Sequence, residues 1–211
     1  MWLLFVAVSL VFVFFPEIDL YVSSLFFDGT GFPMNGTLFE EFFYYSIKPV
    51  LIFFIVSTLL LFAYNLIRNK NILGLRGKVL LYLVLVMSVA PALFVDTLFK
   101  ANWERARPAQ VVEFGGEKQF TPAFIFSDQD GYSFISGHTA GAFSLLGFAL
   151  LAKRQRAFWI AMVYSYGILI SFARVSAGGH FLSDVLTSFF LVTLFTHLFY
   201  KLLIEEKTPH V

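Results

Sequence analysis

The chain contains no cysteine and few charged residues, and both absences limit what it can be. Without cysteine, disulfide bonds and thiolate metal sites are excluded. Only 14% of the residues are charged and 58% are hydrophobic, whereas soluble domains carry about 25% charged residues. The net charge of +1 gives no support for a nucleic-acid partner. We therefore expect an integral membrane protein whose chemistry depends on His, Asp, Glu, Lys, Arg and Ser.

Apolar runs dominate the sequence, and a membrane-spanning helix needs roughly 20 such residues. We predict an all-α polytopic fold with six transmembrane helices, at about 2–16, 46–67, 79–99, 134–152, 157–173 and 182–203. The first run lacks a basic N-terminal region and a small-residue cleavage site, which favours an uncleaved anchor over a signal peptide. No repeat or long linker divides the sequence, so we expect a single domain over residues 1–211.

Basic residues are concentrated in two of the loops between these runs. The segment RNKNILGLRGK at 68–78 holds four of them, and KRQR at 153–156 holds three. Because short basic loops remain in the cytoplasm, both loops and both termini are predicted to lie inside. Of the 14 acidic residues, only Glu205 and Glu206 would then be cytoplasmic. The loops predicted to face the other side are 17–45, 100–133 and 174–181.

The first of three polar clusters on that outer side is KANWERARP, at 100–108. Its cationic side chains could clamp an anion, because guanidinium and ammonium groups suit phosphate oxygens. The candidates are Lys100, Arg107 and also Arg105. Taken alone, the cluster could equally be a juxtamembrane patch whose long side chains reach the interface.

The second cluster is SFISGHTAGAF, at 133–143. Ser136 and Gly137 stand where a helix N-cap belongs, and His138 follows in the first turn. The unpaired amides of a helix N-terminus bind anions. An ordinary serine cap followed by an interfacial histidine would give the same pattern.

The third cluster is RVSAGGHFLSDV, at 174–185. His180 and Asp184 are four residues apart, so they share one face of a helix that begins near residue 180. An aspartate bonded to one imidazole nitrogen fixes the tautomer and raises the basicity of the other nitrogen. Gly178 and Gly179 let a ligand or another loop approach the backbone. A simple chain reversal would not need Arg174 and two further ionisable groups at the membrane edge, where such groups are costly.

Together the three clusters resemble the signature of the type 2 phosphatidic acid phosphatase superfamily, the membrane lipid phosphatases related to vanadium haloperoxidases. The first motif, K-x6-R-P, is matched by Lys100, Arg107 and Pro108. The second, P-S-G-H, is matched by Ser136, Gly137 and His138, with Ile135 in place of proline. The third, S-R-x5-H-x3-D, is matched by Arg174, His180 and Asp184, with Ala173 in place of serine.

The resemblance implies a six-helix core and a role for each matched residue. His180 would attack phosphorus and form a phosphohistidine, and Asp184 would hold its ring. His138 would protonate the leaving oxygen and then activate water. The groups that would hold the phosphate oxygens are Lys100, Arg107, Arg174 and the amides of Ser136 and Gly137. No metal or other cofactor is implied.

The residues around the motifs most resemble the lipid A 4′-phosphatase branch of the superfamily. They are FKANWERARPAQVVEFGG and SAGGHFLSDV. This implies removal of a phosphate from lipid A at the periplasmic face of the bacterial inner membrane. The substrate would come from the outer leaflet of that membrane, with no obligate protein partner. Lipid A 1-phosphatases, phosphatidylglycerophosphate phosphatases and undecaprenyl pyrophosphate phosphatases share the motifs and remain alternatives.

Two other classes of protein fit parts of the pattern. A metal enzyme could draw three ligands from His138, His180 and Asp184, although Arg107 and Arg174 would repel a divalent ion. A small transporter would need polar residues in mid-span, and apart from Asp96 the predicted spans hold few.

The segment 109–133 is the expected specificity loop. The larger outer segment 100–133 suits a phosphorylated sugar through its cations and its aromatic rings. The cations are Lys100, Arg105, Arg107 and Lys118, and the rings are Trp103, Phe114, Phe120 and Tyr132.

Overall fold

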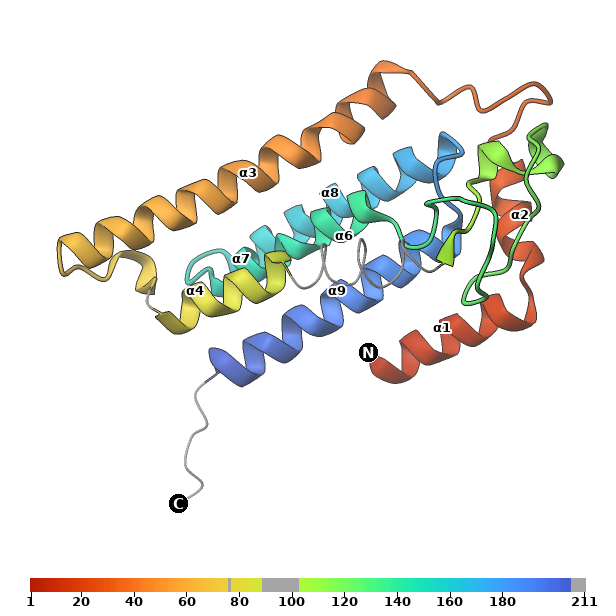
Figure 1. Cartoon of the computed structure of the whole chain (residues 1–211). Helices are drawn as coiled ribbons and strands as arrows, with labels where there is room; N and C mark the ends of the chain where they lie inside the picture. The colour runs from red at the N-terminus through yellow and green to blue at the C-terminus, as the bar shows by residue number, and fades with distance from the viewer. Residues whose placement is uncertain (76, 89–102, 206–211) are drawn as a thin grey trace.

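The computed structural model describes residues 1–75, 77–88 and 103–205. Within these residues the chain forms helices and no strand, apart from one isolated bridge between Val111 and Lys118. The predicted all-α class is therefore confirmed for this part of the chain. Most of the helices run along one common direction, with a smaller cap of short helices and loops at one end (Figure 1).

In the described part of the chain three helices are long and apolar enough to cross a membrane: α3 (Leu38–Ile67), α8 (Arg156–Ser176) and α9 (Leu182–Leu203). A fourth span is possible if α1 (Trp2–Phe14) and α2 (Glu17–Ser24), which are bent by 85° at their junction, count as one. The bend falls at Pro16, which cannot continue the hydrogen bonding of α1. The structure thus supports a membrane protein, but it does not confirm six spans.

Two of the predicted boundaries were wrong. The helix expected at 46–67 begins eight residues earlier, at Leu38, because Thr37 caps it and accepts a hydrogen bond from the amide of Glu40. The span expected at 134–152 is instead a pair of short helices, α6 (Gly137–Ser144) and α7 (Leu146–Leu151). The span expected at 79–99 begins within α4 (Gly77–Val84) and continues outside the described residues.

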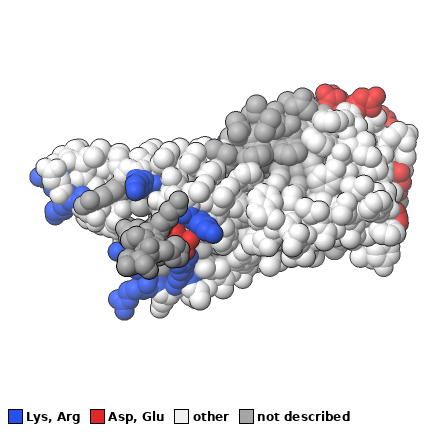
Figure 2. All heavy atoms as spheres, turned by 90° about the horizontal axis from the view of Figure 1, so that it is seen from below, with Lys and Arg blue, Asp and Glu red and all other residues white. Residues whose placement is uncertain are grey.

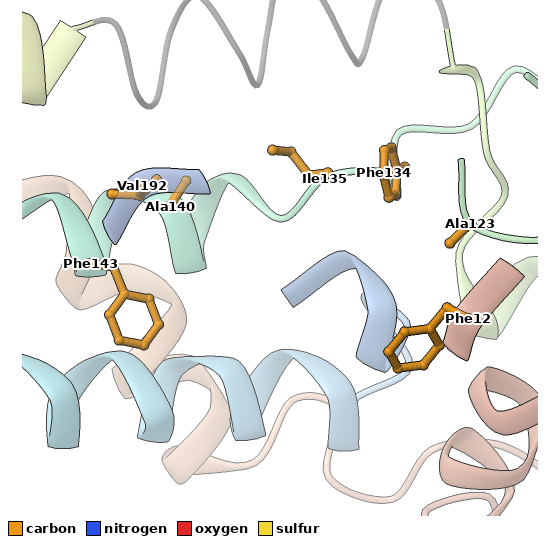
Figure 3. Close-up of a cluster of buried hydrophobic side chains, with 7 residues drawn as sticks. All are labelled: Phe12, Ala123, Phe134, Ile135, Ala140, Phe143 and Val192. Carbon is orange, nitrogen blue, oxygen red and sulfur yellow. The ribbon is translucent and has the colours of Figure 1, made fainter. Parts of the chain in front are cut away.

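Helix α6 is the buried centre of the bundle and packs against both α8 and α9. Small residues allow this close packing: a Cβ atom on Gly167 of α8 would lie 2.6 Å from the ring of Phe143. Phe143 belongs to an apolar cluster that also includes Phe12 of α1 and Phe134 just before α6 (Figure 3). Burial of aromatic rings is the main stabilising contribution of such clusters. This packing fixes the N-terminus of α6 in place.

Charged side chains are segregated along the molecule. Figure 2 shows lysine and arginine gathered toward one end, where α3 ends and α4 begins, and most of the visible acidic side chains at the opposite end. The exposed basic residues there include Arg68, Lys70, Lys153 and Arg154. The N-termini of α6 and α9 lie at the other, acidic end (Figure 1). The polar clusters identified in the sequence therefore lie far from the basic loops.

Candidate active site

All three sequence clusters meet at the acidic end of the bundle. The amide of Ala109, just after the first motif, donates to the carbonyl oxygen of Gly178 at 3.0 Å. The hydroxyl of Ser133, in the second cluster, donates to Oδ2 of Asp184 in the third at 2.5 Å. Hydrogen bonds thus join the third cluster to each of the other two. These bonds bring the three clusters together among the described residues, whereas Lys100 lies outside them.

His180 is buried, and its nearest partner is a backbone carbonyl group. Its Nδ1 atom lies 2.7 Å from the oxygen of Ser133 and 3.6 Å from Oδ2 of Asp184. Because a carbonyl oxygen can only accept, Nδ1 carries the proton and Nε2 keeps its lone pair. The sequence predicted that Asp184 would orient this ring. In the structure the Ser133 carbonyl makes the shorter contact with Nδ1, and the Asp184 carboxylate lies beside the same nitrogen.

The surroundings of His180 favour its neutral form. Burial lowers the pKa of His180, and the positive charges of Arg174 and Arg107 lower it further, against the opposing effect of Asp184. A neutral imidazole with a free Nε2 lone pair is the form that can attack phosphorus. Arg107 is two residues before Ala109, whose amide binds the Gly178 carbonyl, so its charge is near this ring.

Asp184 uses both of its oxygens. Oδ1 accepts from Nη1 of Arg105 at 2.6 Å, and Oδ2 accepts from the hydroxyl of Ser133 at 2.5 Å and the amide of Phe181 at 2.8 Å. Arg105 is completely buried and also donates from Nη2 to Asp19 of α2 at 2.8 Å. The sequence interpretation of Arg105 as an anion clamp is therefore wrong, because two carboxylates already occupy its guanidinium group.

Arg174 faces the same region from the end of α8. Its Nη1 atom donates to Oε1 of Glu40 at 2.6 Å, and its guanidinium carbon lies 4.7 Å from the ring centre of Tyr44. Its Nε atom has no hydrogen-bond partner among the described residues. A Cβ atom added to Gly179 would lie 2.2 Å from Nη2, so the guanidinium group packs directly against this glycine. At Gly178 an added Cβ atom would lie 2.5 Å from the ring of Phe32, so the predicted close approach of another loop is confirmed there.

The start of α6 matches the sequence prediction. Ser136 caps the helix, because its hydroxyl accepts from the amide of Thr139 at 3.4 Å. The amide of Ser136 itself faces the carbonyl oxygen of Asp184 at 3.5 Å, which leaves the Gly137 amide as the better candidate for phosphate. His138 is partly exposed in the first turn and stacks on the ring of Tyr44, with 4.4 Å between ring centres.

Sequence reasoning missed four residues that contact the predicted site: Asp19, Glu40, Tyr44 and Ser133. The first three were assigned to an outer loop at 17–45, whereas the structure places them on α2 and α3. The spacing of Glu40 and Tyr44 was the available signal, since residues four apart share one helical face.

The metal-enzyme alternative finds no support in the geometry. In the described parts of the chain no three His, Asp or Glu side chains are grouped as ligands for a metal ion, and this includes His138, His180 and Asp184. The oxygens of Asp184 are instead directed toward hydrogen-bond donors, among them Arg105.

Comparison with known proteins identifies the family. The sequence model of the PAP2 superfamily matches residues 79–207. The lipid A 4′-phosphatase of Francisella tularensis subsp. novicida is 31% identical over 204 residues, which cover 93% of this chain and 90% of that protein. The lipid A 4′-phosphatase of Rhizobium etli is 31% identical over 201 residues, which cover 85% of this chain and 76% of that protein.

A third relative, the lipid A 4′-phosphatase of Rhizobium leguminosarum, is 28% identical over 204 residues, covering 85% of this chain and 84% of that protein. No solved structure matches significantly. The family match includes all eight residues that the sequence assigned to the site, from Lys100 to Asp184. The chain therefore belongs to the PAP2 superfamily, as a phosphoric monoester hydrolase.

Proposed function

We propose that this protein is a lipid A 4′-phosphatase that works through a phosphohistidine intermediate at the periplasmic face of the inner membrane. The observation that carries the proposal is the buried His180, whose Nδ1 is held by the Ser133 carbonyl while Arg174 and Arg107 lie near it. The substrate is taken from the curated relatives, which act on lipid A.

The proposed reaction has two displacements at phosphorus. In the first, Nε2 of His180 forms a bond to phosphorus while the bond from phosphorus to the sugar oxygen breaks, and His138 gives that oxygen a proton. In the second, His138 takes a proton from water, whose oxygen attacks phosphorus and breaks the bond to Nε2. Inorganic phosphate leaves, and both histidines return to their starting forms. Such a sequence replaces one difficult step with two easier ones.

Cationic side chains would stabilise the charge that develops on the phosphoryl oxygens. Arg174 is suited to this because its Nε donor is buried and has no partner among the residues described. Arg107 is partly exposed and lies within electrostatic range of His180. Lys100 is proposed from the sequence motif alone. Three such cations would supply the neutralisation that a metal ion supplies elsewhere.

The segregation of charge supports the orientation. The basic end seen in Figure 2 would face the cytoplasm, and the site at the opposite end would face the periplasm. The three long apolar helices would cross the bilayer between the two ends. The phosphate of a lipid in the outer leaflet would then lie at the level of His180 while its acyl chains remain in the membrane.

The predicted headgroup surface is smaller than the sequence suggested. Phe114 is buried, and Phe120 is partly buried with its ring against Phe181, so both rings pack mainly within the protein. Tyr132 is 54% exposed, and Phe126, which stacks near Trp103, is 66% exposed. Phe126 and Tyr132 are therefore the aromatic residues that we propose for contact with the glucosamine headgroup.

Phosphate release by the purified protein in detergent tests the proposal. Lipid A, phosphatidylglycerophosphate and undecaprenyl pyrophosphate are compared, each with and without excess EDTA and vanadate. We expect lipid A to have the highest kcat/KM, with turnover that persists in EDTA and is inhibited by vanadate. If either other lipid is better by about tenfold, which corresponds to ~1.4 kcal/mol of transition-state binding, the lipid A assignment is wrong.

A further inference from the structure

Helix α3 lies outside the segment that matches the PAP2 superfamily, yet two of its side chains touch the site. The family match begins at residue 79, whereas α3 spans Leu38–Ile67. Glu40 and Tyr44 are one helical turn apart, so both project toward α8 and the start of α6. Helix α3 packs against α8, and both run toward the end of the bundle that holds the site (Figure 1).

Tyr44 connects two residues of the proposed reaction. Its ring stacks on the imidazole of His138, with 4.4 Å between ring centres, and the guanidinium carbon of Arg174 lies 4.7 Å from the same ring. A planar ring in contact with both groups limits the rotation of each, and a cation above an aromatic face is attracted to it. Tyr44 therefore fixes the distance between the proposed proton donor and the proposed phosphate-binding cation.

Glu40 holds the same arginine from another direction. Its carboxylate accepts from Nη1 of Arg174 at 2.6 Å, and both side chains are 7% exposed. Nη1 is thereby committed to Glu40, whereas Nε has no partner among the described residues. The carboxylate also offsets one positive charge, which weakens the attraction of the site for any phosphate group.

We propose that Glu40 and Tyr44 are positioning residues for the site. Tyr44 sets the relative placement of His138 and Arg174, and Glu40 orients Arg174 while reducing the affinity for the phosphate product. This inference rests on the proposed function, because it assigns roles to α3 within the same reaction.

The neighbouring residues provide matched controls. Glu41 and Tyr45 belong to the same turn of α3 and are exposed, and Tyr45 is 66% exposed. The variants Tyr44→Leu, Tyr44→Phe and Tyr45→Leu are compared for kcat and KM with lipid A, and circular dichroism confirms their folding. We expect Tyr44→Leu to lower kcat at least about tenfold, with Tyr44→Phe and Tyr45→Leu within about threefold of the wild type. A loss in Tyr44→Phe as large as that in Tyr44→Leu would overturn the role of the ring.

The pair Glu40→Gln and Glu41→Gln tests the second residue. Glutamine keeps a carbonyl oxygen for Nη1 but removes the negative charge, so we expect Glu40→Gln to bind vanadate about tenfold more tightly. Glu41→Gln should bind vanadate like the wild type. A purely structural role for Glu40 predicts that Glu40→Gln binds vanadate as tightly as the wild type or more weakly. That result would overturn the proposal, and it can be obtained even if Tyr44→Leu fails to fold. An inactive wild type would refute the proposed function itself, whereas an active wild type with unaffected variants would refute only this inference.

Discussion

The Nδ1 atom of His180 lies 2.7 Å from the carbonyl oxygen of Ser133. A backbone carbonyl holds one tautomer of the ring regardless of side-chain protonation, and the proton on Nδ1 leaves Nε2 available. Ser133 is also tied to the rest of the site, because its hydroxyl donates to Asp184 and its amide donates to the carbonyl oxygen of Arg105 at 3.0 Å. The orientation of His180 therefore depends on the loop before α6 as well as on α9.

His180→Ala should abolish phosphatase activity, because it removes the proposed nucleophile. Asp184→Asn should retain more activity than His180→Ala, since the carbonyl of Ser133 still fixes the ring. We expect a loss of at least about 1,000-fold for His180→Ala and about 10- to 100-fold for Asp184→Asn. Phosphate release from lipid A measures both. More than a tenth of the wild-type rate in His180→Ala would contradict the assignment, and equal losses would show that Asp184 is the dominant orienting group.

Arg105 and Arg107 should respond oppositely to replacement. Arg105→Met leaves Asp19 and Asp184 buried without their counter-charge, and breaking a buried ion pair in this way costs about 3–5 kcal/mol. Arg107→Met should leave the midpoint of thermal unfolding close to that of the wild type while lowering activity. Thermal denaturation in detergent and phosphate release separate the two effects. A stable Arg105→Met protein would show that the buried network contributes little to folding.

The acid limb of the pH profile should report on His180. The neutral ring is the active form and is present above its pKa, so a lowered pKa extends activity to lower pH. Because burial lowers the pKa of His180, the midpoint of the acid limb in kcat/KM should lie below 6.5, the ordinary histidine value.

The variant Arg107→Gln tests whether the acid limb arises from His180 or from the substrate phosphate. Arg107 lowers the pKa of His180, so removing its charge should move the acid limb to higher pH. An acid limb that does not move in Arg107→Gln would assign it to an ionisation other than that of His180.

The orientation in the membrane can be tested in this cysteine-free chain. Glu117 and Arg154 are exposed. The segments that hold them, 112–118 and the turn between α7 and α8, lie at opposite ends of the molecule (Figure 1). Glu117→Cys should react with an impermeant maleimide in intact spheroplasts, and Arg154→Cys should react only after lysis. The reverse pattern would place the site in the cytoplasm and would change the leaflet that supplies the substrate.

Sequence patterns predicted the parts of this molecule that depend on local chemistry. Helix α9 has the bounds expected from its apolar run, and Ser136 caps α6 as its position suggested. Contacts between distant segments could not be predicted in this way. Arg105 looks like a phosphate ligand in the sequence because nothing local reveals Asp19, which lies 86 residues away in the chain.

The same limitation concealed the role of α3. Its apolar run predicted a helix from residue 46, and the polar turn before that residue was assigned to a loop. Thr37 extends the helix to Leu38 and so brings Glu40 within reach of Arg174, 134 residues further along the chain. A contact between residues so far apart in the sequence is determined by tertiary packing, and no local sequence pattern reveals it.

The central claim is removal of the 4′-phosphate of lipid A by His180, and tandem mass spectrometry of the product tests it most directly. Purified wild-type protein and the His180→Ala variant are incubated with bis-phosphorylated lipid A, and the remaining phosphate is located on its glucosamine ring. We expect the wild type to yield lipid A that keeps only the 1-phosphate, and His180→Ala to leave the substrate unchanged. Product that keeps the 4′-phosphate, or equal conversion by both proteins, would contradict the account.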